Sequence, residues 1–247
     1  LTAAAVYATV SAFKSMLTIG SGFTGEMVKA SAIMGATGSQ AKALENEVRR
    51  LGETTAFTGQ EAAGGLTALA MSGLSVEQSL AALAPALNLA AIGQIDMYRS
   101  ADILTNVMYG FRLGAEETTN IVDILATSIT SSNATIEQMA NALSYVAPIA
   151  SAARGEIKEV VSILEVFHNA GIKGSRAGTS LRRAYSNLLS PSEKAANVLH
   201  RLGVSTVDVN GNMLQMTDIM RDLAVKGANT ADVFTLSPDV KGRCLSL

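Results

Sequence analysis

The residue types that most often carry enzyme chemistry are scarce in this chain. Its 247 residues include two histidines, His168 and His200, and one cysteine, Cys244. A nucleophilic serine or cysteine needs a base within hydrogen-bond reach, and neither a Gly-x-Ser-x-Gly nor a Cys-Gly-x-Cys sequence occurs. His168 falls on the same helical face as Val161 and Leu164, which predicts a core histidine rather than a catalytic base. We therefore expect no catalytic residue in this stretch.

Three other patterns that resemble functional sites have simpler explanations. Lys173-Gly174-Ser175 has the order Lys-Gly-Ser rather than the Gly-Lys-Ser of a phosphate loop, and no strand precedes it. The paired carboxylates fall in the first turns of predicted helices, where the helix dipole favours negative charge. Cys244 lies far from both histidines in sequence, so a Cys/His zinc site has no ligand set. We expect neither a cofactor nor a metal. The carboxylate pairs are Glu116 with Glu117 and Glu156 with Glu159.

Basic residues gather in one part of the chain. They are Arg154, Lys158, Lys173, Arg176, Arg182 and Arg183. Arg176 and Arg183 are seven residues apart and so share a helix face, which suits carboxylates of a neighbouring subunit or passing phosphates. No aromatic residue interleaves with these charges, which argues against single-strand binding by stacking. A solvated helix face is the ordinary alternative, and it stays open.

Spaced glycines interrupt the same segment. Gly171, Gly174 and Gly178 lie in an otherwise helical sequence, where each glycine costs roughly 1 kcal/mol relative to alanine. Such glycines indicate a loop, a capped helix start, or a close approach by another backbone. We take this segment as the candidate self-association or partner contact. Its residues are Gly171, Gly174, Gly178, Arg176, Arg182 and Arg183.

Composition predicts a well-packed interior of small and flexible side chains. Hydrophobic residues make up 48% of the chain but aromatic residues only 4%, so Ala, Leu, Val, Ile and ten Met must fill the core. Small side chains let helices approach closely, and methionine fills irregular gaps. The net charge of -2 argues against a whole-surface attraction to nucleic acid or anionic lipid, so any contact with DNA must be local.

Helix-start signals are frequent. Four hydroxyl residues are each followed three positions later by Glu or Gln, the pattern of a capping box, and apolar residues then recur at helical spacing. Pro191 would occupy the first helical position of the last of these helices. We predict at least seven helices in an all-α, compact multi-helix bundle of short, broken amphipathic helices. The predicted boxes are Thr58 with Glu61, Ser75 with Gln78, Thr135 with Gln138, and Ser190 with Glu193.

Breaks in the helical pattern are equally clear. Pro85 and Pro148 each fall well inside a predicted helix, which they are expected to kink or end. The Asn210-Gly211 pair is typical of a type I′ turn, so one small β-hairpin is predicted near Val204–Leu214. No fixed period runs through the chain, so the sequence does not support a solenoid.

These patterns divide the chain into three parts. We expect a helical lead-in arm over 1–52, a core helical domain over 53–224, and a C-terminal segment over 225–247, in a section taken from a longer protein. No signal peptide is indicated at the start. The longest uncharged run, between Glu77 and Asp96, contains polar residues and Pro85, which favours a buried helix over a membrane span.

Five segments together resemble the core region of the tail tape measure proteins of tailed bacteriophages. The resemblance is in order, covers about two-thirds of the chain and is strongest from Phe57 to Leu223. No functional residue is carried over, because the family's core offers no active-site motif to align. The segments are Phe57–Gly73, Gly73–Gly93, Thr135–Ala150, Ala170–Ala184 and Val207–Met220.

The resemblance implies a protein that occupies the lumen of a tail tube in several copies, as a trimer or hexamer, in a phage or prophage. It implies a role in setting tail length during assembly in the host cytoplasm and in leaving ahead of the genome, at the host envelope. The implied partners are other copies, tail tube, tail-tip or baseplate and chaperone proteins, and the host inner membrane at ejection. Local contact with DNA is a further expectation.

The glycines and prolines indicate that this section is not the measuring rod itself. A rod should show sustained heptads with few breaks, whereas this chain has 21 glycines. We therefore expect a folded module of a structural virion protein, taking part in tail assembly, length determination and genome delivery. The first alternative is a membrane-active segment that forms or lines a channel at ejection. The second is an envelope-degrading enzyme.

Overall fold

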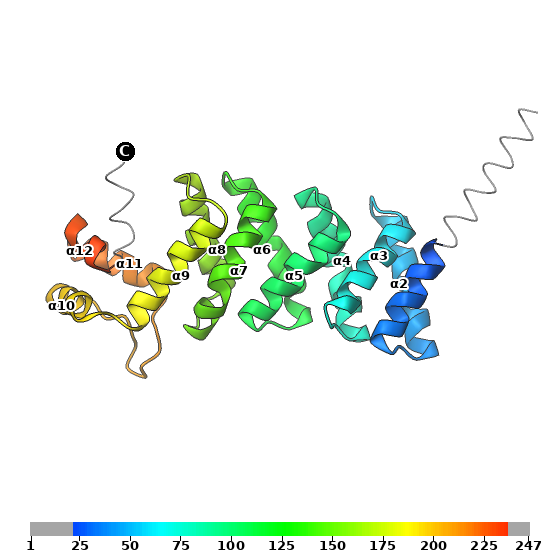
Figure 1. Cartoon of the computed structure of the whole chain (residues 1–247), viewed down its shortest axis with the longest axis horizontal. Coiled ribbons are helices and arrows are strands. Elements are labelled where there is room, and N and C mark those ends of the chain that lie inside the picture. The colour runs from blue at the N-terminus through cyan, green and yellow to red at the C-terminus, as the bar shows by residue number, and fades with distance from the viewer. Residues whose placement is uncertain (1–21, 237–247) are drawn as a thin grey trace, which may run out of the picture. The chain divides into compact units, whose positions relative to one another are not determined.

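The structure, a computed structural model, describes residues 22–236, and over this range it is helical with no named strand. Residues 22–34 are helical and precede the labelled elements (Figure 1). The all-α prediction is confirmed, with more than seven helices. The elements are α2 (Gly38–Thr54), α3 (Gly59–Met71), α4 (Val76–Gly93), α5 (Met97–Phe111), η1 (Ala115–Glu117), α6 (Thr118–Ser131), α7 (Ile136–Ala152), α8 (Ile157–Asn169), α9 (Ser175–Leu189), α10 (Glu193–Leu202), α11 (Met216–Val225) and α12 (Thr230–Leu236).

Three of the four predicted capping boxes are present. Thr58, Ser75 and Thr135 each accept a hydrogen bond from the backbone N–H three residues on, at 3.2, 3.3 and 3.2 Å. In each box the Glu or Gln side chain returns a bond to the cap residue. Thr37 caps α2 in the same way, which the sequence analysis did not predict.

The fourth predicted box, at Ser190, is wrong. Helix α10 begins at Glu193, and its cap is Ser192, whose Oγ accepts from the Ala195 N–H at 3.3 Å. Pro191 therefore lies before the helix rather than at its first position. A residue preceding proline is kept out of the helical region, and Ser190 has φ -138° and ψ 72°, so it ends the helix before it. Ser190 instead closes α9, because its N–H donates to the Ser186 carbonyl.

The two internal prolines do not end their helices. Helices α4 and α7 continue through Pro85 and Pro148. Each proline frees the carbonyl four residues earlier, on Ala81 and Ser144, and both of those residues are exposed. Water can therefore satisfy the freed carbonyls, which makes the interruption tolerable.

Helix ends share one kind of turn. At Gly73, which has φ +87°, the following N–H returns to the Leu69 carbonyl, in the pattern of a Schellman motif. Arg112 and Arg154, at φ +58° and +61°, end α5 and α7 in the same way, although neither is glycine. The same turn also ends α4 at Gln94, α8 at Gly171 and α10 at Gly203. Its irregular spacing along the chain agrees with the absence of a fixed period in the sequence.

The described residues divide into two compact units. The first takes residues up to 105 and 114–122, and the second takes 106–113 and 123 onward. In the first unit α2, α3 and α4 pack on one another, and η1 packs on α4. Leu44, Leu66 and Leu83 are fully buried in its core.

The predicted end of the lead-in arm at residue 52 falls inside α2. Gly52 does not break this helix. A Cβ at Gly52 would lie 2.7 Å from the Gly59 nitrogen, so the glycine permits the start of α3 to approach α2 closely. The predicted boundary at 224 falls inside α11 in the same manner.

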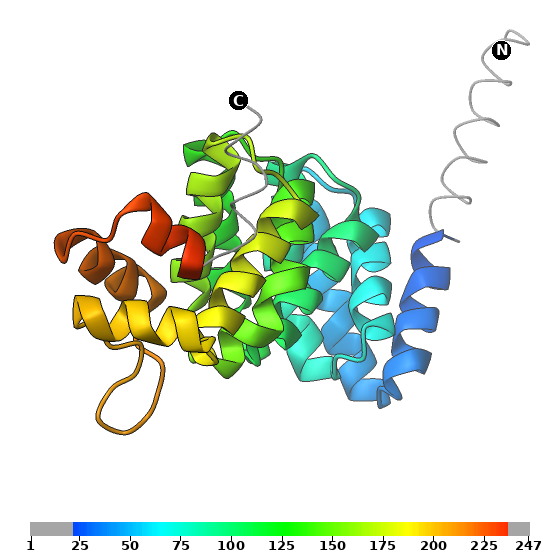
Figure 2. The same ribbon diagram turned by 60° about the vertical axis from the view of Figure 1, so that its left-hand side comes forward.

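In the second unit α7 packs against α8 and α9, and α8 also contacts α9 and α11, while α12 contacts α9 and α10. Leu143, Val160 and Leu181 are fully buried, and Tyr185 is the largest side chain in this core. The connection from α10 to α11 projects from the helices as a long loop (Figures 1 and 2).

The predicted β-hairpin in that loop is wrong. A single antiparallel bridge joins Val207 to Met213, without strands on either side. The type I′ turn is absent too, because it needs a positive φ at both Asn210 and Gly211 and only Gly211 has one. The Gly211 N–H closes a turn on the Asp208 carbonyl. The Asp208 carboxylate accepts the backbone N–H groups of Asn210 and Asn212, at 2.8 and 2.9 Å, so a side chain organises the loop. Val209 is fully exposed, so no buried face favours extending the strands.

Candidate interaction surface around helix α9

Two glycines shape the entry to α9. Gly171, at φ +82°, ends α8, and the next N–H, of Ile172, returns to the Phe167 carbonyl at 2.8 Å. Gly174, at φ +57° and ψ -136°, is the first residue before α9 and offers no side chain to cap it. Residues with a Cβ rarely adopt either conformation, so both glycines are explained by the backbone.

Gly178 has a different task. It is buried, and a Cβ at this position would lie 2.1 Å from the carbonyl oxygen of Ala142 in α7. The absence of a side chain therefore lets α9 pack with its backbone against α7. The three glycines therefore have different roles: Gly171 ends α8, Gly174 precedes α9 without a side-chain cap, and Gly178 permits the close approach. The close approach of Gly178 is made within the chain, and self-association through the segment stays a prediction.

His168 holds the loop between α8 and α9. The ring is buried, its Nδ1 lies 2.6 Å from the Leu164 carbonyl oxygen, and its Nε2 accepts the Gly174 N–H at 3.3 Å. A neutral imidazole protonated on Nδ1 satisfies both bonds. Burial lowers the pKa of His168, and the nearby Lys173 charge acts in the same direction. The predicted core histidine is confirmed, and it positions Gly174 at the start of α9.

The exposed side of α9 carries only positive charge. Arg176, Arg182 and Arg183 are exposed, and the helix contains no Asp or Glu. Arg176 lies in the first turn, where a cation opposes the helix dipole by about 0.3–1 kcal/mol. Within residues 22–236, neither Arg176 nor Arg182 forms an ion pair. We call these three arginines the α9 basic face.

A carboxylate network lies near the opposite side of α9. The Glu159 Oε1 accepts from both the backbone N–H and the hydroxyl of Thr217, each at 2.9 Å. The buried Tyr185 hydroxyl donates to Glu159 Oε2 at 3.4 Å, and the Gln215 amide, with its nitrogen facing the carboxylate, donates at 2.7 Å. Burial, together with the Glu159 charge, raises the pKa of Tyr185. From the sequence, Glu159 was expected only to interact with the helix dipole. The network could not be predicted, because its partners lie up to 58 residues away.

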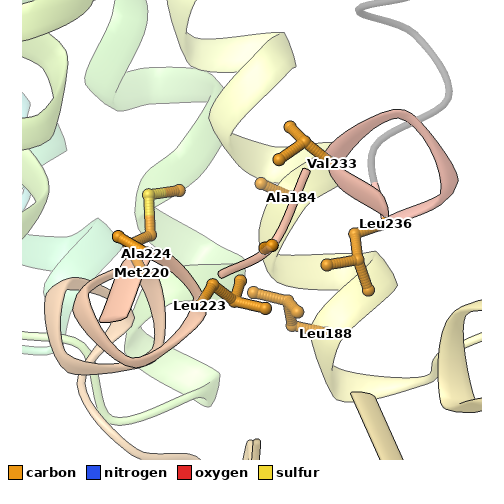
Figure 3. A pocket seen from close by; sticks show the side chains of 8 residues that line it. Ala184, Leu188, Met220, Leu223, Ala224, Val233 and Leu236 are labelled. Carbon is orange, nitrogen blue, oxygen red and sulfur yellow. The ribbon is translucent and has the colours of Figure 1, made fainter. Parts of the chain in front are cut away.

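An apolar groove lies among α9, α11 and α12. Its volume is about 250 Å³, and every side chain that lines it is aliphatic or methionine (Figure 3). We call it the α9–α12 groove. Its lining residues are Ala184, Leu188, Met220, Leu223, Ala224, Ala228, Val233 and Leu236.

The described part of the chain offers little for metal chemistry. Among residues 22–236 no group of three His, Cys, Asp or Glu side chains is arranged to hold a metal ion, and Cys244 lies outside this range. In the same range no single helix is long and apolar enough to cross a membrane. One pair, α4 with α5, meets the length and composition criteria together but is bent by 114° at its break.

Comparison with known proteins identifies the family. The model of the phage-related minor tail protein family matches residues 45–235. The chain is 33% identical over 205 residues to the tape measure protein of Pneumococcus phage Dp-1, covering 83% of this chain and 18% of that protein. It is also 33% identical over 181 residues to the probable tape measure protein of Escherichia phage P2, covering 73% of this chain and 22% of that one. No solved structure matches.

The chain therefore spans about a fifth of the length of these curated relatives. The family match covers most of the chain, including all helices from α3 to α11, and it agrees with the resemblance carried by the five sequence segments. On this evidence the chain belongs to the phage-related minor tail protein family.

Proposed function

We propose that this chain is a folded structural module of a tail tape measure protein, and that it acts in tail assembly rather than as the measuring rod. The observation that carries the proposal is the shortness of the helices. Among residues 22–236 the longest helix, α4, has 18 residues, and an α-helix advances about 1.5 Å per residue, so no helix in this range exceeds about 27 Å. Length determination would then belong to continuous helices elsewhere in the longer protein.

The proposal extends to partners and location. The module would lie in the lumen of the tail during and after assembly, beside other copies of itself in a trimer or hexamer. The α9 basic face would contact acidic groups on those copies, on the tail tube, on tail-tip or baseplate proteins, or on a chaperone. Its unpaired Arg176 and Arg182 support such a contact, because charges left without an internal partner are available to another chain. The same face supports a local contact with DNA phosphates as the genome leaves.

The test is an in-frame deletion of this segment from the tape measure gene of the phage that carries it, followed by electron microscopy of the tails. A continuous helix of 247 residues would be about 370 Å long, so a rod-like segment should shorten the tail by that length. A folded module should instead give no assembled tails, or tails of nearly normal length that fail to deliver the genome. A deletion of equal size in a heptad-rich segment is the control, and it should shorten the tail in proportion. Tails shortened by about 370 Å after deletion of the module would contradict the proposal.

A second candidate function is membrane activity at ejection, as a segment that forms or lines a channel. The bent pair α4 and α5 favours it, because together they reach the length and hydropathy of a membrane segment. Most apolar side chains of α4, such as Leu83 and Leu87, are buried in the first unit, so insertion requires this unit to unfold. Dye leakage from liposomes by the purified chain tests this candidate, and no leakage at any pH would count against it.

A further inference from the structure

Helix α11 begins without a cap of its own. The residue before it, Gln215, makes no side-chain bond to the helix start, whereas α3, α4 and α7 each begin with a capping box. The Thr217 N–H is satisfied instead by Glu159 of α8. A carboxylate at a helix start satisfies a free donor and also interacts favourably with the dipole. The first turn of α11 therefore depends on a side chain from another helix.

Helix α10 is bonded both to α12 and to the end of α11. Asp232 of α12 is buried and pairs with Arg201 of α10, and it also forms reciprocal bonds with Asn229 at the start of α12. The Lys226 ammonium, just after α11, donates to the Gly203 carbonyl at the end of α10. We call residues 193–236 the C-terminal lobe. Because α10 is joined to both other helices, the three can move as one body.

The lobe contacts α8 through α11 and α9 through α12. Besides the Glu159 network, the Asn187 amide donates to the Leu236 carbonyl at 3.2 Å. The remaining contact is apolar, and it encloses the α9–α12 groove (Figure 3). Atoms that line an unfilled space lack packing partners on that side, so this contact is weaker than a close-packed one. Only Met216 and Ile219 of α11 are buried.

We propose that the C-terminal lobe is a lid, which opens as one body about the α9–α10 connection when the Glu159 contacts break. Opening uncovers Leu188 of α9, which is only 6% exposed in the closed form, and widens access to the partly exposed Ala184 beside it. The hinge is Ser190–Ser192, the short connection between α9 and α10, in which Ser190 has φ -138° and ψ 72°. The groove is then the part of the contact between the lobe and α9 that side chains do not fill. The Glu159 carboxylate makes most of the hydrogen bonds that keep the lobe closed.

Thiol labelling tests the opening directly. Cys244→Ser removes the native cysteine, and Leu188→Cys places a thiol at a position that the closed lobe covers. We expect Glu159→Ala to raise the rate at which a maleimide labels Cys at this position by about tenfold, because loss of the Glu159 bonds costs on the order of 1.4 kcal/mol. In the control, Ser186→Cys on the exposed side of α9 should be labelled at one rate with or without Glu159→Ala. Equal labelling of Leu188→Cys in both backgrounds would overturn the lid.

Hydrogen exchange of the full chain separates a lid from local fraying. In Glu159→Ala we expect faster exchange in α10, α11 and α12 together, with α7, α8 and α9 unchanged. Glu165→Ala, on the same helix as Glu159, is the matched control and should change neither set. Acceleration confined to α11, or spread equally over α7–α9, contradicts the proposal. Should Glu159→Ala not fold, Thr217→Val removes one of the same bonds and is expected to act in the same direction with a smaller effect.

Discussion

Within the second unit, helices α7 to α9 are held to one another in a different way from that in which the C-terminal lobe is held to α8 and α9. In the first set α7 carries its own cap, and Gly178 lets the backbones of α7 and α9 approach closely. In the lobe the start of α11 is capped by Glu159 of α8, and the apolar contact with α9 leaves a groove of about 250 Å³. The close packing of the α7 and α9 backbones should therefore be insensitive to the loss of single polar side chains. The contact between the lobe and α8, in contrast, should weaken when the Glu159 carboxylate is removed.

Burial shows the same contrast. Helix α7 buries residues along its whole length, from Ile136 to Ala150, whereas α11 buries two. Segments with few buried apolar contacts open more readily than the rest of a domain. Changes in α7–α9 are therefore expected to alter global unfolding, and changes at the lobe contact to alter local opening.

The largest effect on stability is expected where α9 approaches α7, at Gly178. Gly178→Ala should destabilise the chain by about 3 kcal/mol, because the new methyl group would overlap the Ala142 carbonyl oxygen and force α9 away from α7. Urea unfolding followed by circular dichroism at 222 nm measures the loss. Ser186→Ala, on the exposed side of the same helix, should stay within about 0.5 kcal/mol of the wild type. A Gly178→Ala chain as stable as wild type would show that α9 is not held by this approach.

His168 should give the next largest effect. His168→Ala leaves the Gly174 N–H without its partner and removes a buried ring, at a cost of about 2 kcal/mol. The wild type should also lose stability as the pH falls below about 6.5. The reason is that the lowered pKa of folded His168 keeps the native ring neutral while the unfolded ring takes up a proton.

This pH dependence is measured as the urea midpoint between pH 8 and pH 5. The loss should begin near the ordinary histidine pKa of 6.5 and be complete below the folded pKa. His168→Gln should remove this component, whereas His200→Gln, which changes an exposed residue of α10, should keep it. An unchanged pH profile in His168→Gln would rule out His168 as its source.

A moderate effect is expected from the cap of α7. Thr135→Ala should cost about 1 kcal/mol of global stability, since it leaves the Gln138 N–H without its acceptor. Thr135→Ser retains the hydroxyl and is the control. A loss confined to local exchange at the lobe, without a shift in the urea midpoint, would contradict the division between the two regions.

The smallest expected effect is a gain in stability, from a substitution at Arg154. Arg154 ends α7 at φ +61°, a conformation that costs a side-chain residue on the order of 1 kcal/mol. Arg154→Gly should therefore stabilise the chain by about 0.5–1 kcal/mol in calorimetry. Arg154→Ala keeps the strain and should give no gain, and equal behaviour of the two variants would show that the turn is not strained.

Much of the local structure could be predicted from the sequence. The capping boxes at Thr58, Ser75 and Thr135 depend on residues three apart, so neighbouring residues suffice to define them. The helical class follows from apolar spacing for the same reason. The β-hairpin was wrong because Asp208 supplies the loop bonds, which the turn signal of Asn210-Gly211 does not reveal.

The candidate segment was located by its glycines, but their separate tasks were not assigned. Sequence alone was enough to place the starts of α3, α4 and α7 and to show that Gly171, Gly174 and Gly178 meet unusual backbone demands. The three-dimensional fold was needed to show which glycine faces α7, that Glu159 caps α11, and that the lobe contacts α9 around a groove. The physical reason is the separation along the sequence of the residues that make each contact. Caps and turns are settled by hydrogen bonds within a few residues, whereas these contacts join residues 36 and 58 positions apart, as with Ala142 and Gly178 or Glu159 and Thr217.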